Sequence, residues 1–92
     1  ALAVSLRGKV RVNAISPGWI DTTPEVCLST EDHAQHLVGR VGQPQDISHT
    51  VQFLCSDKAS FITGQNIIVD GGMSKLMTYH NDEGWHFSQE MR

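Results

Sequence analysis

Residues 11–22 are RVNAISPGWIDT, and this stretch decides the fold. Together with Val10 it opens on a run rich in β-branched residues, which predicts a strand over Val10–Ile15. The apolar side chains of this run fall on both faces, as expected for a strand that helices cover on each side. Pro17 and Gly18 follow, a dipeptide typical of turns, so the strand is expected to stop there.

Helices are predicted on either side of this strand. Residues 1–7 are good helix formers, and Gly8 can end them with a left-handed cap. After a loop, Ser29 or Thr30 offers the side-chain oxygen that caps a helix N-terminus. The helix that begins there is predicted to run to about Val38.

A third helix and a second strand follow. Pro44 suits a first helical turn, because the N–H that proline lacks would be unpaired there. The predicted helix spans Pro44–Ser56, and its apolar residues recur at helical spacing (Ile47, Val51, Leu54 and Cys55). Asn66–Val69 is a short apolar run that two glycines soon follow, which predicts a buried strand of a parallel sheet.

This order of elements predicts an α/β fold, the C-terminal piece of a Rossmann-like doubly wound parallel sheet. Two strands joined by a helical crossover should pair in parallel. Two strands alone do not make a stable sheet, so further strands or a second copy of the chain are expected to cover them. The chain also begins within a predicted helix, at Ala1 rather than at methionine. We therefore expect residues 1–92 to be part of one larger domain, with residues 73–92 as a polar tail.

Composition narrows the classes of function. The net charge of −3 gives no reason to expect nucleic acid or an anionic membrane as a partner. The apolar runs fall far short of the roughly 20 residues that cross a membrane. The two cysteines, Cys27 and Cys55, form no Cys-x-x-Cys pair, which favours reduced thiols and a cytoplasmic protein.

Three motifs in order resemble the short-chain dehydrogenase/reductase family. Residues 11–22 are similar to the strand and turn that follow the family's catalytic helix. Residues 39–47, GRVGQPQDI, resemble the lead-in to its penultimate helix. Residues 63–65, TGQ, with residues 69–72, VDGG, are similar to its last strand. The resemblance covers most of the chain and implies an NAD(P)-dependent oxidoreductase.

The family's catalytic elements lie outside this resemblance. The glycine-rich turn that holds the cofactor pyrophosphate does not occur in the sequence. The Tyr-x-x-x-Lys pair is also missing, since Tyr79 is followed four residues later by Glu83. The resemblance therefore implies no catalytic residue in this chain, which corresponds to about the last third of a complete enzyme.

The resemblance does imply cofactor-binding residues: Pro17, Gly18, Ile20 and Thr22. In the family the matching turn lies against the nicotinamide ring of NAD or NADP. The backbone N–H at Ile20 is expected to bond the carboxamide, and the Thr22 hydroxyl the carboxamide or a phosphate oxygen. A Pro-Gly turn also lets the backbone approach a flat ligand closely. Without the pyrophosphate site, the isolated chain is expected to bind no cofactor usefully.

Two further expectations follow from the family. The segments matching Pro44–Ser56 and Asn66–Val69 pack against two-fold copies, which implies a homo-oligomer. Residues 19–29 match the start of the loop that covers the substrate, an alcohol or a carbonyl compound. Glu25, Cys27 and Leu28 could line a pocket there, although an exposed loop is the simpler interpretation.

Three other polar side chains have the residue types of catalytic or metal-binding groups. Asn13 lies in the first strand and is expected to bond neighbouring backbone rather than substrate. His33 and His36 are three residues apart on a predicted helix, but no third ligand stands at a recognised spacing. We expect hydrogen-bonded or solvated histidines and no metal site.

Two functions remain open from the sequence. In the first, the chain belongs to an oxidoreductase that moves hydride between a nicotinamide and an alcohol or carbonyl carbon. In the second, it is a non-catalytic fragment that self-associates or complements a missing N-terminal half.

Overall fold

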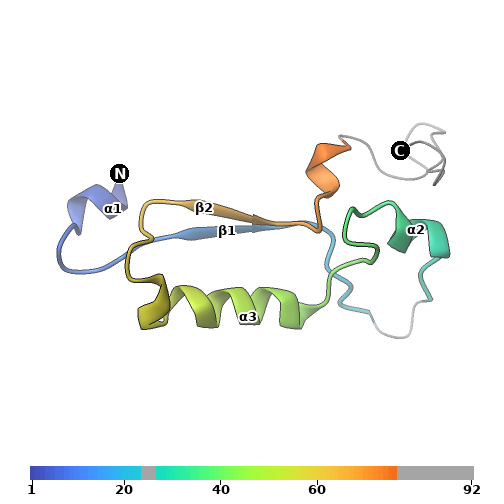
Figure 1. The fold of residues 1–92 in the computed structure, drawn as a ribbon, viewed down its shortest axis with the longest axis horizontal. Helices are drawn as coiled ribbons and strands as arrows, with labels where there is room; N and C mark the ends of the chain where they lie inside the picture. Colours follow the sequence, from blue (N-terminus) through green and yellow to red (C-terminus); the bar gives the residue numbers. More distant parts are fainter. Residues whose placement is uncertain (24–26, 77–92) are drawn as a thin grey trace.

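The computed structural model describes residues 1–23 and 27–76. Its elements follow the chain as helix α1 (Leu2–Ser5), strand β1 (Ala14–Pro17), helix α2 (Thr30–Ala34), helix α3 (Pro44–Leu54), 3-10 helix η1 (Asp57–Ala59), strand β2 (Asn66–Val69) and 3-10 helix η2 (Met73–Lys75) (Figure 1). The predicted order of helix, strand, helical crossover and strand is confirmed.

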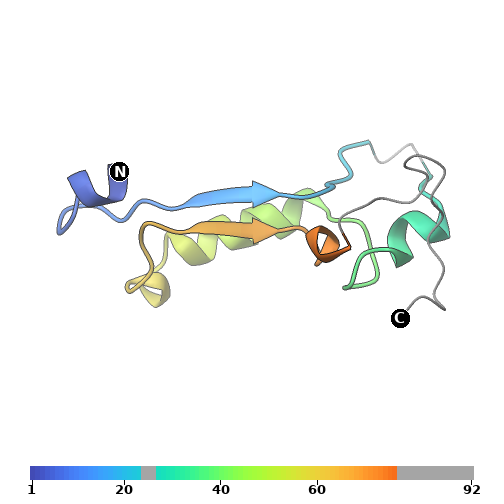
Figure 2. The same ribbon diagram turned by 90° about the horizontal axis from the view of Figure 1, so that it is seen from above.

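The two strands pair in parallel, as predicted. Ala14 lies opposite Asn66 and Pro17 opposite Val69, so the strands end at the same edge of the sheet. Helix α3 runs along one face of this pair, and α2 and η2 lie beyond the ends of the strands (Figures 1 and 2). The side chains of Ile15, Val51 and Leu54 line a groove between β1 and α3. The apolar stripe predicted for this helix therefore faces the sheet.

Strand β1 begins four residues later than predicted. Residues 10–13 lie outside the β1–β2 ladder, and side chains bind their surroundings instead. The Val12 N–H donates to Thr63 Oγ1 at 3.0 Å, and the Gly64 N–H donates to the Val12 carbonyl at 2.7 Å. Asn13 bonds backbone on two sides, donating from Nδ2 to the Ile62 carbonyl and accepting at Oδ1 from the Gln65 N–H. The structural role expected for Asn13 is confirmed.

Helix α2 is shorter than predicted, ending at Ala34 rather than near Val38. Its start is as expected, because Ser29 and Asp32 form a reciprocal capping box. The early end has a tertiary cause. The Val38 N–H donates to the Gly71 carbonyl at 3.1 Å instead of to the preceding helical turn. A contact with a distant turn thus replaces the last helical bonds.

Little of the described chain is fully buried. The buried apolar side chains are those of Val41, Ala59 and Met73. Ile68 is 60 % exposed on the sheet face opposite α3, and Phe61 is fully exposed. The radius of gyration is 16.4 Å, compared with about 12 Å for a compact chain of this length. The sheet therefore leaves one face and its edges uncovered, as the sequence predicts.

The predicted tail, residues 73–92, begins inside the packed part of the chain. Met73 begins η2 and is buried, so it belongs to the packed part of the chain. Residues 77–92, with Tyr79, lie outside the described residues. None of the described helices is long and apolar enough to cross a membrane.

The Asn13 bonds predict a measurable contribution to stability. Replacing Asn13 with Ala should lower the free energy of unfolding by about 1 kcal/mol, because the Gln65 N–H loses its acceptor and the Ile62 carbonyl loses one of its two donors. Urea denaturation measures this loss. Gln65→Ala is the matched control, since that side chain makes a single long bond of 3.5 Å to the Thr63 carbonyl. Equal losses in the two variants would contradict the role assigned to Asn13.

Candidate nicotinamide site at the carboxyl ends of the strands

The predicted cofactor turn lies where the two parallel strands end. Pro17 is the last residue of β1, and the Gly18 N–H donates to the Val69 carbonyl at 2.9 Å. In open α/β sheets, ligands bind outside the carboxyl ends of the strands. The turn therefore occupies the part of the fold in which a ligand is expected.

Gly18 leaves room for Asp70, a role that the predicted close approach to a ligand did not include. A Cβ at this position would lie 2.6 Å from Cβ of Asp70 and 2.8 Å from its Cα. No side chain fits in this space, because Asp70 backbone fills it. The close approach that requires glycine is thus to the chain after β2, whatever else the turn binds.

Ile20 is held by a short parallel bridge to Gly42. The Gly42 N–H donates to the Trp19 carbonyl at 3.0 Å, and the Asp21 N–H donates to the Gly42 carbonyl at 2.9 Å. In this pattern the N–H of Ile20 points away from Gly42. Among the hydrogen bonds of the described residues, none uses that N–H. The geometry thus leaves a directed donor at the position the sequence singles out.

Thr22 is exposed and lies next to a local turn. Its neighbour Thr23 donates both its N–H and its hydroxyl to Asp21 Oδ1, at 3.0 and 3.3 Å. The adjacent threonines therefore differ: the Thr23 hydroxyl serves the turn, and the Thr22 hydroxyl faces solvent. Of the loop residues that follow, Glu25 lies outside the described residues, and Cys27 is exposed and free.

A cavity of about 320 Å³ opens beside this turn. Its walls come from the turn, the connection into α3, helix α3 itself and the chain after β2 (Trp19, Ile20, Val38, Arg40, Gly42, Asp46, Thr50, Val69, Asp70 and Gly71). Of these residues, the sequence predicted Ile20 as cofactor-binding but none of the charged residues. Arg40, Asp46 and Asp70 occur in the sequence only within the family motifs at residues 39–47 and 69–72.

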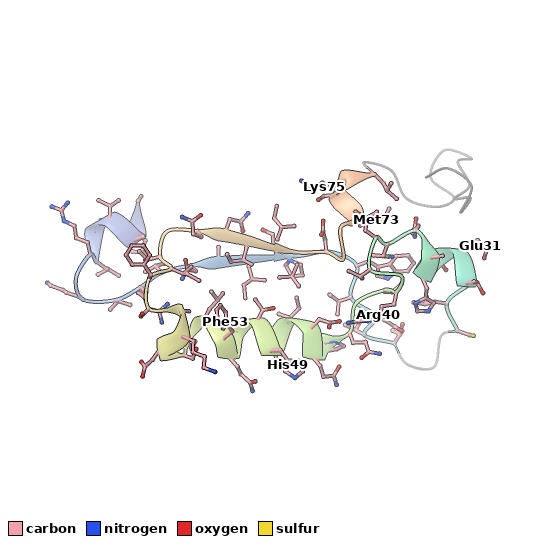
Figure 3. All side chains as sticks on the ribbon, in the orientation of Figure 1. Glu31, Arg40, His49, Phe53, Met73 and Lys75 are labelled. Atoms are coloured by element: carbon pink, nitrogen blue, oxygen red, sulfur yellow. The ribbon has the colours of Figure 1, made fainter. Side chains whose placement is uncertain are left out.

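Arg40 and Asp46 form a bidentate ion pair at the start of α3. The guanidinium Nη1 and Nη2 donate to Asp46 Oδ2 and Oδ1, each at 2.8 Å. Asp46 Oδ2 also accepts the Gln43 N–H at 2.7 Å, which closes a capping box. Figure 3 places Arg40 near the N-terminal end of α3. The bond from Arg40, followed by that from the Gln43 N–H, holds the pKa of Asp46 well below its usual range.

His33 and His36 bind backbone, as the expectation of hydrogen-bonded histidines predicts. His33 Nδ1 accepts the Val41 N–H at 3.1 Å. His36 is buried, its Nδ1 lies 3.0 Å from the Asp32 carbonyl, and its ring lies 6.1 Å from that of Trp19. Within residues 1–23 and 27–76, no group of three or more His, Cys, Asp or Glu side chains could hold a metal ion.

Comparison with known proteins agrees with this geometry. Residues 1–74 match the family described as enoyl-(acyl carrier protein) reductase. An uncharacterized oxidoreductase of Thermotoga maritima is 52 % identical over 89 residues, covering 86 % of this chain and 35 % of that protein. The 3-oxoacyl-[acyl-carrier-protein] reductase FabG of Aquifex aeolicus is 44 % identical over 68 residues, covering 70 % of this chain and 27 % of its own length.

Solved structures give the same result. An apo SCOR enzyme from Clostridium thermocellum superposes with a TM-score of 0.75 at 52 % identity, over 95 % of this chain and 34 % of that one. A 4-hydroxyisoleucine dehydrogenase complexed with NADH has a TM-score of 0.66 at 37 % identity, over 80 % and 32 % of the two chains. The chain belongs to the short-chain dehydrogenase/reductase family, and its fold is part of a Rossmann-like α/β sheet. It spans about a third of the length of these relatives.

The ion pair predicts a pH-dependent contribution of Asp46. Its pKa is lower in the folded state than the usual value near 4, so its stabilising effect is present above about pH 4 and is lost as the pH falls below that value. Asp46→Asn should therefore cost about 1 kcal/mol at pH 7, the usual value of a helix cap, and much less at pH 3. Thermal unfolding at the two pH values measures the difference.

Glu31→Gln is the control for this experiment. Glu31 also lies in the first turn of a helix but has no ion pair among the described residues. Its replacement should change stability little at either pH. A loss in Asp46→Asn that is the same at pH 3 and pH 7 would show that the carboxylate charge does not contribute.

Proposed function

We propose that this chain supplies the nicotinamide side of an NAD(P)-dependent oxidoreductase. The observation that carries the proposal is the Ile20 N–H, which the bridge to Gly42 turns away from Gly42, in a residue that lines a cavity at the carboxyl ends of the strands. The 4-hydroxyisoleucine dehydrogenase that shares the fold is complexed with NADH. Carbonyl or alcohol compounds are the corresponding substrates.

The residues present fit such a cofactor. The Ile20 N–H is a donor for the carboxamide oxygen, and the exposed Thr22 hydroxyl can donate or accept. When bound, the nicotinamide supplies the hydride that is transferred. The chain's own residues bind and orient the ring: Pro17 and Gly18 set the path of the turn, and the bridge to Gly42 fixes the direction of the donor. The proton would come from the family's catalytic tyrosine, in a segment outside this sequence.

The proposal is tested by grafting this chain in place of the matching segment of the Aquifex aeolicus reductase. The graft should bind NADH or NADPH, measured by fluorescence titration. Thr22→Ala in the graft should raise the cofactor Kd about 5-fold, because one hydrogen bond of ordinary strength is lost. Thr22→Ser should restore most of the affinity, since it keeps the hydroxyl.

Thr23→Ala is the matched control in the same graft. Its hydroxyl bonds Asp21 within the turn, so its loss should leave the Kd within about 2-fold, within the scatter of an exposed substitution. A graft that folds but binds neither cofactor would refute the proposal. Equal effects of the two threonine variants would remove Thr22 from the binding site.

A second candidate function is self-association, which the exposed apolar side chains favour. Phe53 of α3 is 46 % exposed, and Ile68 of β2 is 60 % exposed. These residues lie in the two segments, Pro44–Ser56 and Asn66–Val69, through which a homo-oligomer is proposed. A non-catalytic fragment could use the same surfaces to pair with a copy or with a complementary half.

Sedimentation velocity of the 92-residue chain tests this second candidate. Ile68→Lys should weaken association at least 10-fold, because a charge replaces an apolar side chain in the contact. Leu2→Lys is the control, since Leu2 is 61 % exposed but lies in α1, away from both segments. A chain that remains monomeric at millimolar concentration would exclude self-association. Equal weakening in both variants would exclude the proposed surface.

A further inference from the structure

One turn contacts both the Pro17–Ile20 turn of the candidate site and the chain after α2. This turn comprises residues 70–73 and is called the β2 turn, since it follows β2 directly. On one side it meets the Pro17–Ile20 turn, and on the other it meets residues 35–38, which follow α2. Figure 3 labels Met73, the buried end of this turn, at the same end of the sheet as the chain after α2.

The first contact is between backbones. Cα and Cβ of Asp70 occupy the space that a Cβ on Gly18 would need. The Gly18 N–H donates to the carbonyl of Val69, the residue just before Asp70. Any shift of Asp70 is therefore passed to the Pro17–Ile20 turn, because backbone atoms in direct contact have no side-chain freedom to absorb it.

The second contact holds residues 35–38. Gly71 and Gly72 have positive φ angles of 63° and 85°, a conformation that other residues rarely adopt. A Cβ on Gly72 would lie 2.7 Å from Leu37 Cβ, and a Cβ on Gly71 3.0 Å from Val38 Cγ2. The Val38 N–H also donates to the Gly71 carbonyl at 3.1 Å. The glycines thus let the chain after α2 lie directly on the β2 turn.

The shape of the β2 turn depends on one carboxylate. Asp70 Oδ1 accepts the Gly72 N–H and Oδ2 accepts the Ser74 N–H, each at 2.9 Å. The Asp70 carbonyl also accepts the Met73 N–H at 3.1 Å. Bonds from Ser74 lower the pKa of Asp70, so the carboxylate is charged at neutral pH and its bonds are charge-assisted. One oxygen thus holds Gly72, and the other holds Ser74 at the end of the turn.

We propose that Asp70 is a positioning residue for the cofactor. Its carboxylate fixes the β2 turn, and that turn sets the distance between the Pro17–Ile20 turn and residues 35–38. Asp70 acts through these neighbours, not on the reacting atoms. The inference rests on the proposed function, because that function assigns the Pro17–Ile20 turn to cofactor binding.

Asp70→Asn tests the proposal in the Aquifex aeolicus graft. The amide keeps one acceptor and loses the other, so the cofactor Kd should rise about 5-fold. The kcat should stay within about 2-fold, because no group that touches the reacting atoms changes. Asp70→Ala, which loses both acceptors, should have the larger effect. Asp57→Asn is the control, since Asp57 is exposed in η1 and far along the chain from the site.

Leu37→Ala separates positioning from general loss of stability. Leu37 is 63 % exposed, so its truncation should leave the protein folded. It loosens only the contact between residues 35–38 and Gly72, so it should leave the cofactor Kd unchanged. If Asp70→Asn lowers Tm without changing the cofactor Kd, or if Asp57→Asn raises that Kd as much as Asp70→Asn does, the proposal is overturned.

Hydrogen exchange in the 92-residue chain keeps this test independent of the proposed function. Asp70→Asn should speed exchange of the Val38 and Gly18 amides, whose acceptors are the Gly71 and Val69 carbonyls, at least 5-fold. Asp57→Asn should not. If exchange is faster in the 92-residue variant but the graft binds no cofactor, the proposed function is refuted while the coupling is supported. Unchanged exchange would overturn the coupling itself.

Discussion

The rest of this structure depends on the parallel pairing of β1 with β2. Register places Pro17 opposite Val69, so both strands end at one edge and their following turns meet there. Gly18 makes this meeting possible, because Asp70 occupies the space of its missing side chain. The bridge between Ile20 and Gly42, the cavity and the contact with residues 35–38 all lie beyond that edge.

Polar contacts hold the described chain together more than a hydrophobic core does. Three apolar side chains are fully buried, whereas Asn13 and Arg11 bond backbone carbonyls across about 50 residues of sequence. Both donate to the Ile62 carbonyl, and so fix the start of β1 against the loop before β2. A two-stranded sheet with one helix has too little apolar surface to bury. The chain spans about a third of the length of its relatives.

Local sequence predicted the elements well where short-range chemistry decides them. Pro44 and the reciprocal bonds of Gln43 and Asp46 begin α3 at the expected residue, and the run Asn66–Val69 is the strand that was expected. The predictions that failed were boundaries. Strand β1 begins late because Thr63 and Asn13 side chains replace ladder bonds, and α2 ends early because Val38 bonds Gly71. Each partner lies about 30 or 50 residues away, beyond any local pattern.

The sequence by itself determined the α/β class, the parallel strand pair and the resemblance to the family, because these follow from the order and periodicity of the residues. It also singled out the turn at Pro17–Ile20. Only the tertiary structure decided that Asp70 leaves no room for a side chain at position 18 and that Arg40 and Asp46 pair at the cavity. It also decided that the β2 turn contacts both the Pro17–Ile20 turn and residues 35–38. These are contacts between distant residues, and a distance in space is not set until the strands pair.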